Sequence, residues 1–150
     1  MSKIVEVYNQ DFIPFLADFL HDSYVEFDKI KFKIEENLLE IPFEKLLYQY
    51  KNELKNYIFF GKYSYPLYSY NLKIFHVEDY NIIEFSNCGM GDSDIIANTY
   101  YNDIEKILEI EFQLSKKLKI QVRDLKIVLE KCSFIKNIER WSFALFLIDH

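Results

Sequence analysis

The chain has few of the residues that interrupt a fold or brace it covalently. Its 150 residues include three Gly, three Pro and two Cys. So few chain-breaking residues leave little room for a flexible linker, and we predict one domain over residues 1–150. Cys88 and Cys132 have no CxxC spacing, which excludes the common zinc and redox motifs. We interpret both as thiols in a reducing cytosol, with a disulfide between them as the alternative.

Arginine and histidine are also scarce, which argues against phosphate and metal chemistry. Only Arg123 and Arg140 carry the guanidinium group that holds a phosphate through two hydrogen bonds. The net charge of −6 repels phosphate backbones, so we expect no nucleic-acid partner. His21, His76 and His150 show no HxH or HExxH spacing, so we expect no metal and no cofactor.

No segment has the pattern of a targeting signal or a membrane span. The first residues contain no long apolar run and no small-residue cleavage site. The apolar run Trp141–Ile148 is shorter than a bilayer-spanning helix requires. We therefore expect a cytoplasmic protein with no membrane partner.

Apolar residues that alternate with polar ones are abundant. Half of the chain is hydrophobic and 18% is aromatic, so the chain is suited to form a packed core. Within Lys106–Glu130 the alternation has a period of two, which is typical of strands with one face on a core. We predict a three-stranded antiparallel meander there, and the other elements are arranged around it.

Further strands are predicted from the same alternation. We expect an edge strand at Ile4–Tyr8. Tyr24–Ile34 changes phase near Asp28-Lys29, where we expect a bulge or bend. Leu39–Phe43 is predicted to return beside it, with Pro42 at an edge or a strand end. A hairpin is expected from Leu72–Val77 and Ile82–Phe85, joined by a turn over Glu78–Asn81.

Helical spacing predicts two helices, Phe12–Leu20 and Glu44–Lys55. Asp11 is expected to cap the first, and Pro14 lies in its first turn, where a missing N–H does no harm. Ile95–Asn102 is interpreted as a helical turn, Ser133–Glu139 as a turn or short helix, and Trp141–Ile148 as a strand or helix. These elements predict an α+β fold: a curved, mostly antiparallel sheet of about six to eight strands with two or three packed helices.

The Gly-rich segment Asn87–Asp94 matches no catalytic or ligand-binding motif. It lacks the Lys of a phosphate-binding loop, the ligand spacing of a calcium loop and the GxSxG elbow of a hydrolase. We interpret it as a turn, or as an acidic loop presented to a partner. Acidic residues in predicted turns can share one rim of a sheet, and the set proposed for partner binding includes Glu78, Asp79, Asp92 and Asp94.

Tyrosines from Tyr63 to Tyr70 form an aromatic belt with two interpretations. Tyrosine favours strands, so the belt is suited to a half-buried sheet surface. Tyrosine is also enriched at binding hot spots, so an interface is the alternative interpretation. We place Tyr65, Tyr68 and Tyr80 beside the acids as candidate partner-binding residues.

In size, acidity and acid-and-Tyr-rich turns the chain resembles small bacterial immunity proteins, which neutralise toxins of interbacterial competition. The resemblance implies a non-catalytic cytoplasmic inhibitor that binds a cognate toxin, such as a basic nuclease, and blocks it sterically. An acidic rim would steer the encounter and tyrosines would anchor it.

Two alternatives come from other classes. A small-ligand-binding β-rich domain would need an apolar cavity lined by residues such as Phe59, Tyr63 and Phe85. A small enzyme would need converging polar groups, and His76 with Glu78 or Asp92 is the most plausible set. If the chain is an immunity protein, no catalytic residue is expected.

Overall fold

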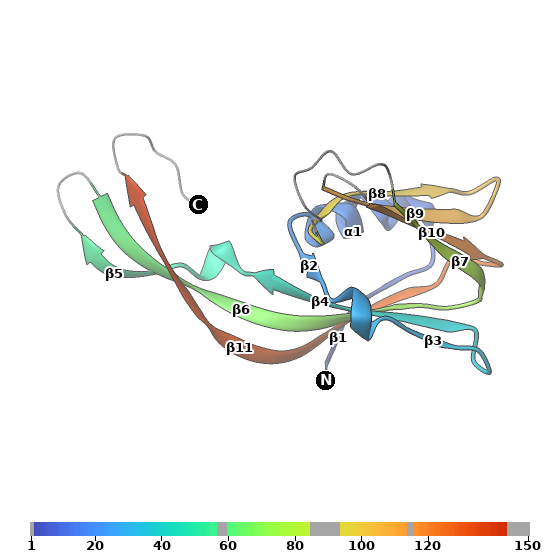
Figure 1. The fold of residues 1–150 in the computed structure, drawn as a ribbon, viewed down its shortest axis with the longest axis horizontal. Helices are drawn as coiled ribbons and strands as arrows, with labels where there is room; N and C mark the ends of the chain where they lie inside the picture. Colours follow the sequence, from blue (N-terminus) through green and yellow to red (C-terminus); the bar gives the residue numbers. More distant parts are fainter. Residues whose placement is uncertain (1, 57–59, 85–93, 114–115, 144–150) are drawn as a thin grey trace.

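A computed structural model describes residues 2–56, 60–84, 94–113 and 116–143, and these form a mostly antiparallel β structure with one α-helix (Figure 1). The first sheet contains, in spatial order, β1 (Ser2–Val7), β11 (Ile127–Phe143), β6 (Phe60–Ile74), β4 (Leu38–Leu46) and β2 (Tyr24–Val25), with β3 (Lys31–Lys33) on β4 and β5 (Asn52–Asn56) on β6. The second contains β7 (Val77–Glu84), β10 (Lys116–Val122), β9 (Ile107–Phe112) and β8 (Ile96–Asn102). The predicted α+β class is therefore wrong.

The two sheets face each other across one core. Alternation of apolar residues places one side of each strand inside, as the period of two requires. Core residues with at most 1% exposure come from both sheets: Leu39, Ile41, Leu72 and Ile74 from the first, and Leu108, Ile110, Leu118 and Ile120 from the second. We call this two-layered part the body.

The first predicted helix is confirmed as α1 (Ile13–Leu20), preceded by a 3-10 turn (Gln10–Phe12). Leu16 and Leu20 are fully buried, and the helix packs beside β8. The cap differs from the prediction, because the Asn9 side chain accepts the Asp11 N–H at 2.9 Å. Asn9 therefore caps the 3-10 turn, and α1 itself begins after Phe12 with no side-chain cap.

The second predicted helix, Glu44–Lys55, is wrong. The segment contains the end of β4, a 3-10 turn (Tyr48–Tyr50) and β5. Leu46 and Lys45 lie opposite Leu67 and Tyr68 in the ladder with β6, so pairing across the sheet overrides the local helical spacing. Likewise, Ile95–Asn102 contributes β8 and Ser133–Glu139 lies within β11. Beyond Phe143, the run Trp141–Ile148 lies outside the described residues.

The predicted meander is half right. β9 and β10 pair as an antiparallel hairpin, with Ile120 opposite Leu108. The third strand, β11, instead crosses to the other sheet, where it pairs with β1 and β6. The crossing follows the Arg123-Asp124 break, and alternation alone is the same for a strand in either sheet.

The predicted hairpin of Leu72–Val77 and Ile82–Phe85 is also wrong. β6 ends at Ile74, and His76 turns the chain with a φ of 56°, so that β7 starts in the second sheet. Glu78–Asn81 therefore lies within a strand that pairs with β10, and it makes no turn.

Pro42 is accommodated by a gap in the sheet. β2 and β3 both pair with β4, and the 3-10 turn Phe27–Lys29 separates them, close to the predicted bend. The Pro42 carbonyl accepts the Glu26 N–H at 3.3 Å, so Pro42 directs its backbone toward that interruption. A missing N–H at this point costs no regular ladder bond. The edge strand predicted at Ile4–Tyr8 is confirmed as β1.

β6 and β11 extend well beyond the body as a curved arm (Figure 1). Among the described residues the arm comprises 48–56, 60–68 and 133–143 and thus includes β5. Register shifts in β11 leave Cys132 and Ile135 without opposite residues in β6. Such bulges bend a strand and increase its twist, and both lie where the arm leaves the body.

Replacing a core residue of the body tests this arrangement. Ile120→Ala should lower the free energy of unfolding by about 2–5 kcal/mol, because the side chain is fully buried between the sheets. Ile104→Ala is the matched control: its side chain is 95% exposed, and its effect should stay within about 0.5 kcal/mol. Equal effects in denaturant titrations would contradict the assigned core.

Candidate functional site

The acidic residues proposed for partner binding do not gather at one rim. Glu78 and Asp79 are exposed on β7, and Tyr80 is half-buried, with its ring stacked on Phe32 at 5.5 Å. The Asp94 carboxylate instead accepts a hydrogen bond from the Lys116 ammonium at 2.9 Å. Asp92 lies outside the described residues.

Pairing with β10 shows how far apart Asp79 and Asp94 lie. Asp79 lies opposite Gln121 near one end of β10, whereas Asp94 binds Lys116 at the other end. Five residues of strand correspond to about 16 Å. Asp79 and Asp94 therefore belong to opposite ends of the second sheet.

The candidate tyrosines of the belt belong to β6, in the other sheet. Tyr65 is 1% exposed and Tyr68 is half-buried. Tyr65 is therefore a core residue of the arm, and the belt divides between interior and surface positions. Tyr63 is half-buried on the arm, and Phe59 and Phe85 lie outside the described residues.

His76 lies at the turn between the sheets, half-buried. Its Nδ1 atom is 3.3 Å from a guanidinium nitrogen of Arg123. Glu78, its proposed partner, is exposed two residues further on. Among the described ranges, no three His, Cys, Asp or Glu side chains are grouped so that they could hold a metal ion.

The arm is the feature that sequence reasoning missed. Its root is an aromatic cluster: the Tyr70 ring stacks on Phe43 at 5.3 Å and meets the edge of Phe19 on α1, also at 5.3 Å. The Lys45 ammonium lies 5.3 Å from the Phe19 ring centroid and donates to the His21 carbonyl at 3.1 Å. Burial lowers the pKa of Lys45. This cluster holds the base of the arm against the helix.

Cation and ring contacts also lie where the arm leaves the body. The Lys131 ammonium lies 3.9 Å from the Tyr68 ring centroid, and Phe134 meets Tyr68 edge-on at 5.6 Å. Lys131 and Tyr68 also line an open groove of about 650 Å³ together with Tyr50, Lys51 and Pro66. Such contacts give these rings fixed positions while leaving one side open.

The opposite face of the arm has its own ring contacts. Tyr48 meets Tyr65 edge-on at 5.1 Å, and Arg140 donates to the Tyr48 hydroxyl at 3.3 Å. Tyr63 packs over Gly61, where an added Cβ would lie 2.9 Å from the ring. A side chain at residue 61 would therefore have to displace the Tyr63 ring.

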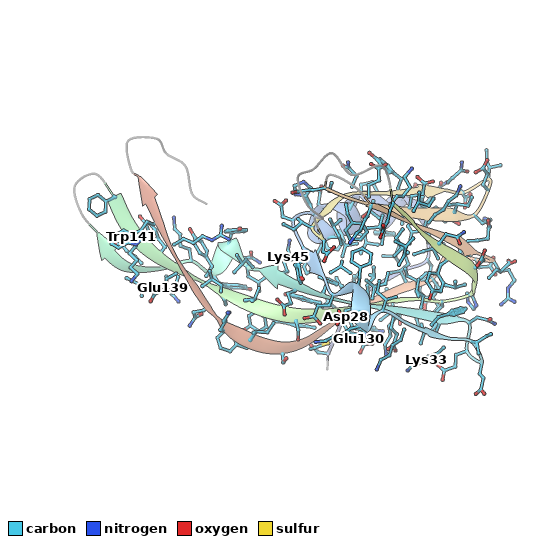
Figure 2. The ribbon with its side chains drawn as sticks, viewed as in Figure 1. Asp28, Lys33, Lys45, Glu130, Glu139 and Trp141 are labelled. Carbon is cyan, nitrogen blue, oxygen red and sulfur yellow. The ribbon has the colours of Figure 1, made fainter. Side chains whose placement is uncertain are left out.

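The far part of the arm joins a charge pair to an aromatic pair. The Lys62 ammonium contacts the Glu139 carboxylate at 2.8 Å and lies 5.7 Å from the Trp141 ring centroid. Trp141 in turn meets Phe60 at 5.5 Å. Figure 2 shows Trp141 and Glu139 out on the arm and Lys45 where the arm meets the body.

Large apolar side chains remain exposed along the arm, because no second sheet covers it. Tyr50 is 59% exposed, Phe134 51% and Trp141 47%. Tyr48, Leu54, Phe60 and Ile135 are also exposed. A series of exposed rings on one projection is typical of a macromolecular contact surface.

Charge is segregated between the arm and the rest of the chain. The arm has five basic residues and two acidic ones: Lys51, Lys55, Lys62, Lys136 and Arg140 against Glu53 and Glu139. The rest of the chain has 13 basic and 22 acidic residues. The net charge of −6 thus hides a basic projection on an acidic body. Counting charged residues segment by segment would have shown that these segments are basic. Only strand pairing, however, brings the segments together into one surface.

The buried root gives a test at alkaline pH. Burial raises the pKa of Tyr70 to about 12, whereas an unfolded tyrosine titrates near 10. The folded state therefore binds more protons over this window, so this contribution to stability is complete below pH ~10 and is lost between about 10 and 12. Tyr70→Phe should reduce that loss in urea titrations. Tyr100→Phe, at an exposed position, should not, and equal losses in both variants would contradict the burial.

The structure contains no helix, within the ranges it describes, with the length and apolar character that crossing a membrane demands. Comparisons with protein-family models, with curated proteins and with solved structures give no match.

Proposed function

We propose that this chain is a non-catalytic protein-binding domain of the immunity type, which binds and blocks a cognate toxin in the cytoplasm. The observation that carries the proposal is the arm, a single layer of strands with exposed aromatic side chains. Tyrosine and tryptophan supply large contact areas at low entropy cost, so they commonly anchor protein interfaces.

The arm also changes the partner we propose. Net charge alone favours a basic toxin met by an acidic rim, but the proposed acids are dispersed, and the arm, which exposes Tyr50, Phe134 and Trp141, is basic. Complementary charge therefore favours a partner with an acidic contact patch. The acidic body keeps the complex soluble and orients the basic arm toward that patch.

Truncating two anchors on the arm tests the proposal. The chain would be co-expressed with the tagged product of the adjacent gene, and binding would be measured by pull-down and calorimetry. The double variant Phe134→Ala with Trp141→Ala should bind at least about 30-fold more weakly, since hot-spot side chains contribute about 2 kcal/mol or more. Protection of cells from the toxin should fall in parallel.

Tyr100→Ala is the matched control, because this ring is 51% exposed on the second sheet, away from the arm. It should leave binding and protection unchanged. Thermal unfolding should show that both variants remain folded. Unchanged binding by the double variant, or equal loss in the control, would refute the arm as the contact surface.

A further inference from the structure

One edge of the arm has no neighbouring strand among the residues that the structure describes. β1 pairs with β11 only from Ile127 to Lys131. From Ser133 to Arg140, β11 pairs with β6 on one side, while no described strand pairs with the other. An edge of this length offers regularly spaced N–H and C=O groups to an added strand.

The hydrogen-bond pattern identifies the groups that face outward. The Pro66 carbonyl accepts the Leu47 N–H at 3.0 Å, so Pro66 directs its backbone away from β11. Its opposite residue, Asn137, therefore directs its N–H and C=O away from β6, toward the open edge. Alternation gives Glu139, opposite Ser64, the same direction. Both residues are exposed.

Side chains along this edge set the chemistry of an added strand. Lys136, Ile138 and Arg140 alternate, so they share one face of the arm. An antiparallel neighbour would place three of its own residues opposite them, at positions i, i+2 and i+4. Complementary residues at those positions are acidic, apolar and acidic.

We propose that the open edge of β11 binds an extended segment of the partner as an added strand, with acidic residues four positions apart and an apolar residue midway. This inference rests on the proposed protein-binding function and specifies how the partner would be bound. Backbone bonds to Asn137 and Glu139 provide the register, and cross-strand ion pairs with Lys136 and Arg140 provide selectivity.

Two other occupants are disfavoured. Antiparallel pairing of the edge with a second copy about Ile138 would place Lys136 opposite Arg140 twice, and like charges opposite each other are unfavourable. A single-stranded nucleic acid could stack on the rings and contact the lysines, but it cannot pair with the backbone N–H and C=O groups of the edge as a strand does. Both occupants are outcomes of the test below.

The test uses peptide probes and the full chain. The matched probe is the acetylated and amidated peptide Thr-Thr-Glu-Thr-Val-Thr-Glu-Thr-Thr, and the shifted probe moves the second Glu by one position, to the other face. Nuclear magnetic resonance titration should show shifts at the amides of Asn137 and Glu139. The matched probe should bind about fivefold or more tightly than the shifted one or its Lys counterpart.

Protein variants distinguish the contribution of backbone hydrogen bonds to peptide binding from that of charge. Asn137→Pro removes one outward N–H and should abolish the response, whereas Asn137→Ala retains that N–H and should preserve it. Lys136→Glu should weaken matched binding about fivefold or more, and the same charge change in the body, Lys31→Glu, should have little effect. If the proline variant misfolds, N-methylation of the peptide's edge amides on the unmodified protein gives the same test.

Three results would overturn the inference. The first is equal binding of the matched and shifted probes, and the second is tighter binding of a deoxythymidine decanucleotide than of the matched probe. The third is slowed hydrogen exchange of the edge amides that increases with protein concentration in the absence of peptide. The last would assign the edge to a second copy. These probes contain no cognate toxin, so their failure removes the added-strand mode alone. Failure of the pull-down with the adjacent gene product would remove the protein-binding function itself.

Discussion

The antiparallel pairing of β6 with β11 joins the two parts of the molecule. These strands have 15 and 17 residues, far longer than the mean strand, and their ladder, interrupted by two bulges, runs from the body to the far part of the arm. In the body their apolar faces close the core against the second sheet. In the arm no second sheet among the described residues covers the same ladder, so Phe134 and Trp141 remain exposed, while Tyr65 is buried by its neighbours within the arm. The exposed surface thus follows from strand length.

The root of the arm is packed against the body, whereas the far part of the arm is exposed. At the root, Phe19, Phe43 and Tyr70 fix the arm against α1, and bulges at Cys132 and Ile135 give it its bend. Lys131 lies beside the Tyr68 ring near the root, and Lys62 lies beside the Trp141 ring further out. A rigid base with an uncovered far part is suited to presenting binding groups without large reorganisation.

Local patterns predicted the elements whose partners are close in sequence. Pro14 and the helical spacing located α1, and alternation located the β9–β10 hairpin. Alternation could not tell which sheet β11 joins, because both sheets require the same period. Leu46 and Leu67 pair across the sheet, which overrode a helical spacing that was equally regular. The basic surface was hidden because its basic residues come from segments far apart in the sequence, and only the fold brings these segments together.

Hydrogen exchange of the whole chain, free and bound to its co-purified partner, tests the central claim most directly. The account predicts slowed exchange at amides of the arm, within residues 60–68 and 133–143, and unchanged exchange on the exposed face of β7–β10–β9–β8. Protection confined to that second sheet, with none on the arm, would contradict it.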